Sequence, residues 1–164
     1  MIDQYLQWKP YFDIVPLTAD HAHEVSEVHG QRFPRQWSDE EFLSLLLQPN
    51  VFGFIARQTN AFFSQPTGGF VLAREVAGEA EILTIAVVEK FGGAGLGWRL
   101  MQAALREAGQ RGGETIFLEV EAANHAAVQL YRKLGFQSVA ERPAYYSGPD
   151  GAKSSALVMK RDLR

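Results

Sequence analysis

The first third of the chain combines polar capping residues with apolar residues at helical spacing. Val25 and Val28 lie on one helical face after Thr18, a residue that can cap a helix. The segment SDEE at 38–41 is typical of a capping box, so a second helix is expected to begin there and to end before Pro49. The inward face of this second helix is expected to consist of Phe42, Leu45 and Leu46.

Three apolar runs typical of strands follow. They are VFGFIARQ at 51–58, GGFVLAREV at 68–76 and EILTIAVV at 81–88. The short turn AGEA joins the last two runs and predicts an antiparallel hairpin. Between the first two runs, TNAFFSQPT at 59–67 sets two phenylalanines among turn residues, and we expect both side chains to be exposed.

The rest of the chain alternates helical and strand patterns. Gly112-Gly113 ends a helix, 114–121 (ETIFLEVE) predicts a strand, and 124–134 predicts another helix. Residues 136–140 begin a further strand, and 154–161 (SSALVMKR) predict the last one. The inward positions of the first of these helices are Gly97, Leu100, Met101, Ala104, Leu105 and Ala108. With no repeat and no linker, the pattern indicates a single α/β domain of α+β type over 1–164.

Composition narrows the class of protein. The 164 residues are 46% hydrophobic and 21% charged, which is typical of a soluble globular chain. A formal net charge of −3 provides no basic field, so neither nucleic acid nor an anionic membrane is expected as a partner. The absence of cysteine excludes disulfides, thiolate metal sites and a cysteinyl acyl intermediate. Without a leader-like start or an apolar run of roughly 18 residues, a cytoplasmic protein is expected.

The segment VEKFGGAGLGWRL at 88–100 concentrates four glycines within six positions. A strand, a glycine loop and a helix bring together free backbone N–H groups and the positive end of a helix dipole, which can hold a pyrophosphate. A flexible loop or close strand–helix packing would use glycine too. Gly97 is followed by Trp98 and Arg99, which excludes a P-loop. The Gly-x-Gly-x-x-Gly dinucleotide fingerprint fails because its third glycine would fall on Trp98 or Leu100.

The remaining spacing over 92–97 is similar to the Gln/Arg-x-x-Gly-x-Gly/Ala segment of the GNAT superfamily of N-acetyltransferases. The flanking segments EAEILTIAVVEKF, LEVEAANHAAVQLYRKLGF and AYYSGPDGAKSSALVMKRDL stand in that family's order. RFPRQWSDEEF at 32–42 resembles the Phe-Pro-Trp-Ser segment of the RimI-like branch, the ribosomal-protein alanine N-acetyltransferases, with two extra residues. The resemblance covers about Phe33 to Leu163 and is weakest over 59–67.

This resemblance implies a GNAT fold: a mixed, mostly antiparallel sheet of six to seven strands, flanked by about four helices and splayed between the fourth and fifth strands. It also implies acetyl-CoA as co-substrate, no metal, and direct transfer of acetyl to an amine. In the RimI-like branch that amine is the N-terminal α-amine of a protein or peptide. Acetylation of a small-molecule amine, or binding of CoA without turnover, remain alternatives.

The resemblance also implies a set of cofactor-binding residues. The main chain of one strand would hold pantetheine, the glycine loop would hold pyrophosphate, and a helix would supply further contacts. These residues are Ile85, Ala86, Val87, Gly92, Gly93, Ala94, Gly95, Leu96, Gly97, Trp98, Asn124 and Tyr131. The family usually has Gln or Arg at the position of Gly92 and often basic residues at those of Gly93 and Trp98. The loop therefore relies on amides, with Arg99 the nearest cation, and we expect weaker cofactor binding.

The catalytic residues are implied in the same way. The family's base falls on Glu119 and its acid on Tyr131, although a solvated carboxylate and a core aromatic would give the same residues. Glu81 is a rival base, and it also suits a surface charge. Strand alternation places Glu119 on the face opposite Ile116, Leu118 and Val120.

Two further groups of residues complete the picture. The pair Tyr145 and Tyr146 resembles the pair that lines the peptide groove of N-terminal acetyltransferases, and it could instead be a packed strand edge. The four histidines form no constellation typical of metal ligands, and His21 and His23 are expected to be solvated.

Overall fold

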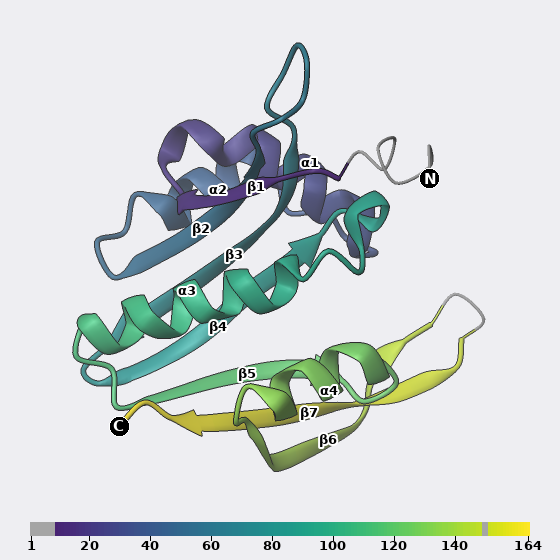
Figure 1. Ribbon diagram of the computed structural model, residues 1–164. Helices are drawn as coiled ribbons and strands as arrows, with labels where there is room; N and C mark the ends of the chain where they lie inside the picture. The colour runs from purple at the N-terminus through teal and green to yellow at the C-terminus, as the bar shows by residue number, and fades with distance from the viewer. Residues whose placement is uncertain (1–8, 149–150) are drawn as a thin grey trace, which may run out of the picture.

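Seven strands form one sheet in the computed structural model, which describes residues 9–148 and 151–164 (Figure 1). Their spatial order is β1-β2-β3-β4-β5-β7-β6, and every neighbouring pair is antiparallel except the parallel pair β4 and β5. The strands are β1 (Phe12–Pro16), β2 (Val51–Gln58), β3 (Thr67–Val76), β4 (Glu79–Val87), β5 (Thr115–Glu121), β6 (Gln137–Ser147) and β7 (Lys153–Asp162). The mixed, mostly antiparallel sheet expected from the sequence is confirmed.

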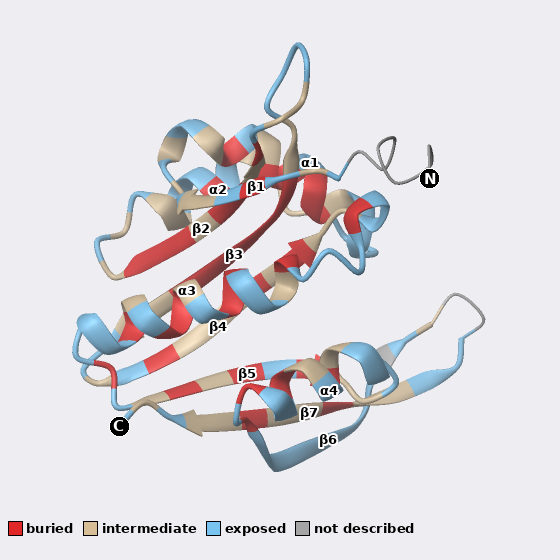
Figure 2. Cartoon of the chain, in the orientation of Figure 1, coloured by how far each residue is buried: buried red, intermediate tan, exposed pale blue. Residues whose placement is uncertain are grey.

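Helices cover both faces of the sheet. They are α1 (Ala22–Arg32), α2 (Asp39–Leu46), α3 (Leu96–Gln110) and α4 (His125–Lys133), with short 3₁₀ turns η2 (Ala19–His21) and η3 (Glu89–Phe91). Helices α3 and α4 pack on one face over the larger apolar cluster, which contains all five predicted apolar core positions of α3 after Gly97. Helices α1 and α2 pack on the other face, where Val25, Val28 and Phe42 are buried as predicted. Figure 2 shows the buried stripe along α3.

The sheet divides between β4 and β5. Glu79 to Glu81 of β4 pair with Thr115 to Phe117 of β5, and no later residue of β4 pairs with β5. In Figure 1 the two strands lie together near the C-terminus of the chain and diverge toward the glycine loop. A register shift beside Leu72 gives β4 one extra residue, Leu83, just after the paired part. The splay expected from the resemblance is thus confirmed.

Two local predictions need correction. The β3–β4 turn is shorter than the predicted AGEA, because only Ala77 and Gly78 lie between the strands, both with positive φ (53° and 88°). The expected capping box is half formed: Ser38 Oγ accepts a hydrogen bond from the Glu41 N–H (3.1 Å), which caps α2. The Glu41 carboxylate instead pairs with Arg35 (3.2 Å). It therefore does not accept the second capping-box hydrogen bond, which the Ser38 N–H would donate.

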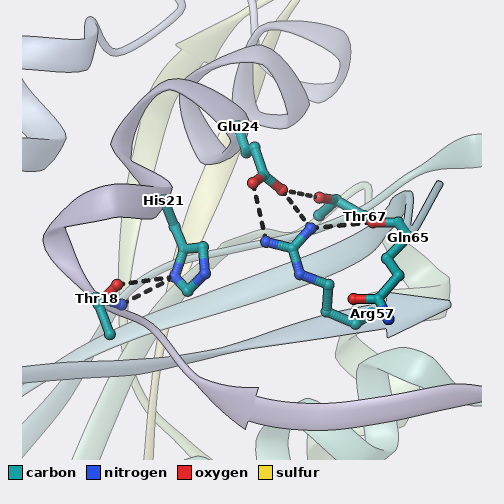
Figure 3. Close-up of polar contacts among 6 residues, drawn as sticks. All are labelled: Thr18, His21, Glu24, Arg57, Gln65 and Thr67. Atoms are coloured by element: carbon teal, nitrogen blue, oxygen red, sulfur yellow. Dashed lines mark hydrogen bonds and ion pairs between the residues drawn. The ribbon is translucent and has the colours of Figure 1, made fainter. Parts of the chain in front are cut away.

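One ion pair ties α1 to the sheet (Figure 3). The Glu24 carboxylate accepts two hydrogen bonds from the Arg57 guanidinium (2.7 and 2.9 Å) and one from the Thr67 hydroxyl (2.5 Å). Arg57 also donates to the Gln65 carbonyl (3.0 Å). The hydrogen bond from Arg57 is the main cause that lowers the pKa of Glu24. These contacts fix α1 against β2, β3 and the loop between them.

The first two histidines have specific partners. His21 Nδ1 accepts a hydrogen bond from the Thr18 N–H (3.0 Å), and Figure 3 shows this contact beside the Glu24 pair. His23 is exposed, as expected, and it also contacts the Asp39 carboxylate at 2.8 Å. That hydrogen bond is the main cause that raises the pKa of His23. The first contact lies just before α1, and the second joins the first turn of α1 to the first residue of α2.

Two other surface features bear on earlier expectations. Phe62 and Phe63 in the β2–β3 loop are fully or almost fully exposed, as predicted. Among the described residues, no helix is both long enough and apolar enough to cross a membrane.

Candidate active site

The glycine loop leaves open space in front of its main chain. Gly93 and Gly95 have positive φ (83° and 74°), a conformation that glycine adopts without strain. A Cβ atom built on either residue would meet no atom within 4 Å. Gly95 occupies the N-cap position of α3 and has no side chain to cap the helix. The loop therefore presents bare backbone at the positive end of a helix dipole.

Most N–H groups of this loop have no acceptor among the residues that the structure describes. Gly92 donates to the Glu89 carbonyl (2.9 Å) and Ala94 to the Phe91 carbonyl (3.3 Å), and helical bonding resumes only at Arg99. Five amides in between donate no hydrogen bond to another described residue; they belong to Gly93, Gly95, Leu96, Gly97 and Trp98. Convergent free amides at a helix N-terminus form an anion-binding site. The residues present therefore fit a diphosphate.

Gly97 and Arg99 both make contacts within the fold. A Cβ atom on Gly97 would lie 3.2 Å from Leu130 Cδ2, so this glycine allows α3 to approach α4 closely. Arg99, expected to be the nearest cation to the loop, donates to the Phe12 carbonyl of β1 (3.0 Å). Its guanidinium is thus committed to the sheet edge. The indole of Trp98 is partly exposed beside the loop.

The diverging part of β4 offers polar groups on its free side. Ile85, Ala86 and Val87 pair with β3 and have no partner on β5. Along an antiparallel pair, alternate main-chain groups point away from the partner strand, here toward the split. Thr84 on the same segment is buried, and no other described residue contacts its hydroxyl within hydrogen-bonding distance. This segment therefore has unused hydrogen-bonding capacity where the sheet opens.

Glu119 and Tyr131 lie on opposite faces of β5, next to the split. Glu119 lies two residues after Phe117, the last β5 residue that pairs with β4. Its side chain is 34% exposed. Tyr131 belongs to α4 and packs in the core above β5, with its ring edge-on to Phe136 at 6.0 Å between centroids. The predicted acid and base therefore do not touch each other, and they flank the strand from its two sides.

The Glu119 carboxylate has a partner that sequence analysis did not single out. Arg142 Nη2 lies 3.0 Å from Glu119 Oε1. The Arg142 guanidinium also stands 5.6 Å from the centre of the Tyr145 ring. Tyr145 is 55% exposed, so its ring is not a packed strand edge. The side chain of Tyr146 lies outside the described residues, although its main chain pairs with Ser154.

Burial affects the ionisation of the Tyr131 hydroxyl. Desolvation raises the pKa of Tyr131 to about 12, because the charged phenolate is disfavoured in an apolar surrounding. Its hydroxyl forms no hydrogen bond to another described residue. On the turn that leads into α4, Asn124 Oδ1 accepts from the Ala127 N–H (3.2 Å) and caps the helix. The Asn124 amide nitrogen has no acceptor among the described residues.

Glu81, the rival base, has a different environment. It lies at the last position where β4 still pairs with β5, opposite Phe117. Its carboxylate pairs with Arg74 of β3. Glu119 stands farther along the split, two residues past the last β5 position that pairs with β4.

A buried histidine organises the loop between α1 and α2. His29 is 2% exposed, and its Nδ1 accepts a hydrogen bond from the Trp37 N–H (3.2 Å). Its ring stacks on Phe33 (4.3 Å between centroids) and on Trp37 (4.8 Å). The signal for burial is its spacing: His29 follows Val25 by four residues and so shares its inward helical face. Sequence analysis found no role for His29.

Comparison with known proteins agrees with this geometry. The model of the acetyltransferase (GNAT) family matches residues 18–136. The chain belongs to this family. Its fold superimposes on the crystal structure of the ribosomal-protein-S18-alanine N-acetyltransferase from Escherichia coli with a TM-score of 0.83, at 27% identity, over 93% of this chain and 94% of that one.

Two curated relatives place the chain within the family. It is 34% identical over 150 residues to the N-alpha-acetyltransferase RimI of Mycobacterium tuberculosis, covering 89% of each chain. It is 35% identical over 91 residues to the [ribosomal protein bS18]-alanine N-acetyltransferase of Haemophilus influenzae, covering 56% of this chain. That match spans 62% of the H. influenzae protein, less than two thirds of its length. The RimI-like resemblance is confirmed.

The environment of His29 predicts a specific pH dependence of stability. Burial, followed by the charge of Arg35, lowers the pKa of His29 to about 4 from an ordinary value of 6.5. Between these values the unfolded chain binds a proton that the folded chain does not, so the free energy of unfolding falls as the pH falls from 6.5 toward 4. The full contribution is about 3 kcal/mol.

Denaturant unfolding at several pH values measures this effect. His29→Asn should flatten the dependence over this window, because asparagine can still accept from the Trp37 N–H but does not titrate. His23→Gln, a change at the exposed histidine, should leave that part of the slope in place. A slope that persists in His29→Asn would contradict the assignment to His29.

Proposed function

We propose that the chain transfers the acetyl group of acetyl-CoA to the N-terminal α-amine of a protein or peptide. The observation that carries the proposal is the split between β4 and β5, with five free amides at the start of α3 beside it. A carboxylate and a phenol flank the same split from opposite faces. Family membership and the names of the relatives support the same activity.

Different parts of the site suit different parts of CoA. The amides around Gly95 suit the diphosphate of CoA, and the free side of Ile85 to Val87 suits the pantetheine arm. The Asn124 amide nitrogen, which has no acceptor within 9–148 and 151–164, could donate a further hydrogen bond to that arm. Acetyl-CoA, when bound, supplies an acetyl thioester as the group to be transferred.

Glu119 and Tyr131 account for the protons in a direct transfer. The amine nitrogen forms a bond to the acetyl carbon, and the carbon–sulfur bond breaks. Glu119 accepts the proton that the amine loses, and Tyr131 donates its hydroxyl proton to the departing thiolate. A tyrosine phenol with its ordinary pKa near 10 is protonated at neutral pH. Burial raises the pKa of Tyr131 further, so the donor is in the required form. A β4 amide facing the split would stabilise the oxyanion.

The pKa of the acceptor favours an α-amine over lysine. A free α-amine with a pKa near 8 is about one tenth neutral at pH 7, whereas a lysine near 10.4 is neutral on the order of once in a few thousand molecules. A single carboxylate such as Glu119 suffices for the first. The exposed Tyr145 and the neighbouring Tyr146 are proposed to contact the peptide, and the named substrate of several relatives, a ribosomal protein with N-terminal alanine, is of this class.

A peptide panel tests the acceptor. Purified chain with acetyl-CoA should acetylate an alanine-first peptide at its N-terminus, read by mass spectrometry. An N-blocked peptide with an internal lysine should react at least about 100-fold more slowly, because so little of its amine is neutral. Acetylation of the lysine peptide or of a polyamine at the higher rate would reject the N-terminal assignment.

The glycine loop can be tested through binding of CoA alone. Gly95→Ala places a methyl group in the open space beside the free amides, at a φ of 74°. We expect the Kd for CoA, measured by calorimetry, to rise about tenfold, with a loss of about 1 to 2 kcal/mol in stability. The matched control is Gly109→Ala on α3, where a Cβ atom also meets nothing within 4 Å. This control should leave the Kd unchanged and stabilise the chain by about 0.5 to 1 kcal/mol. An unchanged Kd in Gly95→Ala would place CoA elsewhere.

Removal of the phenolic hydroxyl tests the proposed acid. Tyr131→Phe keeps the ring in the core against Phe136 and removes only the proton donor. The kcat should fall about 10- to 100-fold, while the Kd for CoA stays within about twofold, because the loss affects proton transfer and not binding. Steady-state rates and calorimetry measure the two quantities. An unchanged kcat would dismiss Tyr131 as the acid.

A further inference from the structure

Arg142 reaches the proposed base from the far side of a strand. In the sheet, Glu119 is opposite Val158 of β7, while Arg142 of β6 is opposite Ala156 of β7. The guanidinium therefore crosses β7 diagonally to reach Glu119 Oε1 at 3.0 Å. Ala156, the β7 residue opposite Arg142, is small and buried.

The β6 main chain is distorted where it presents this arginine. Regular pairing with β7 is lost between Arg142 and Tyr146. Within the gap Ala144 has a φ of 54°, which costs a residue with a Cβ atom roughly 1 to 2 kcal/mol. The distortion accompanies the placement of the Tyr145 ring 5.6 Å from the guanidinium, in a cation–π contact. Strained backbone of this kind persists where the surrounding structure requires it.

Other charged groups on this face of the sheet are engaged elsewhere. Glu81 of β4 pairs with Arg74 of β3, Glu121 of β5 accepts from Ser154 of β7 (2.5 Å), and Lys160 of β7 lies 3.9 Å from Asp162. Among the described residues, Arg142 is the cation in contact with Glu119. The charge beside the base is thus set by one side chain.

We propose that Arg142 is a positioning residue that selects the neutral form of the acceptor amine. It holds one oxygen of Glu119, which leaves the other oxygen to accept the proton of the amine. A protonated α-amine would bring a second positive charge next to the guanidinium, whereas a neutral amine meets no such repulsion. The inference rests on the proposed function. In that reaction, Arg142 would set the pH range in which the bound amine is neutral.

The pH dependence of kcat tests this role. With the alanine-first peptide saturating, the acidic limb of the profile reports the loss of a proton from the bound amine. Arg142→Gln removes the repulsion, so the bound amine should keep its proton more tightly. The limb should then move to higher pH by about 0.5 to 1 unit. Arg142→Met, a second uncharged variant, should give the same shift.

Two controls separate charge from structure. Arg142→Lys keeps the positive charge, and its acidic limb should stay within about 0.2 unit of the wild type. Arg106→Gln removes the same charge from an exposed position on α3 and should not move the limb. The proposal would be overturned if the acidic limb stayed in place in both Arg142→Gln and Arg142→Met. It would also be overturned if the limb moved as far in Arg142→Lys as in the uncharged variants. A wild-type chain that acetylates no peptide at any pH would instead refute the proposed function on which it rests.

Discussion

Hydrogen bonding between β4 and β5 ends after three residue pairs, and the candidate groups of the molecule are arranged around that break. Both strands remain paired on their outer sides, β4 to β3 and β5 to β7. The break therefore frees main-chain groups without leaving either strand unsupported. Free strand edges bind extended ligands, and the loop of free amides at the start of α3 extends this capacity to an anion.

The two faces of β5 provide different environments for the two groups proposed to exchange protons. On the α4 side, Tyr131 is buried, and loss of its proton is suppressed by desolvation. On the other side, Glu119 keeps contact with water and with one cation. Neutral and charged groups are thus separated by the thickness of one strand. Opposite environments on either side of a reaction path are a common means of assigning acid and base roles.

The spacing of apolar residues predicted most of the helices and strands, because burial of one face of an element sets that spacing directly. The apolar positions of α3 and the alternation of Ile116 to Val120 are set by which face meets the core, and both are confirmed. The split, by contrast, came from resemblance, since no local pattern in β4 or β5 marks where pairing stops. The contact of Glu119 with Arg142 depends on registers across three strands, which a single sequence does not encode in any short spacing. His29 carried a helical signal for burial, but its bond to the Trp37 main chain follows from the path of a loop.

In the proposed binding loop, main-chain groups would take the place of side-chain charge. The Gln or Arg usual at the position of Gly92 and the basic residue frequent at that of Gly93 are absent, and Arg99 donates to the Phe12 carbonyl. What remains is a set of short-range dipoles, which act on an anion only at contact, whereas a full charge acts over a Debye length of about 8 Å. Such a site selects its ligand by fit more than by long-range attraction. The positive φ of Gly93 and Gly95 suits glycine, and a Cβ atom built on either residue would meet no atom within 4 Å, so the space beside these amides stays open to a ligand.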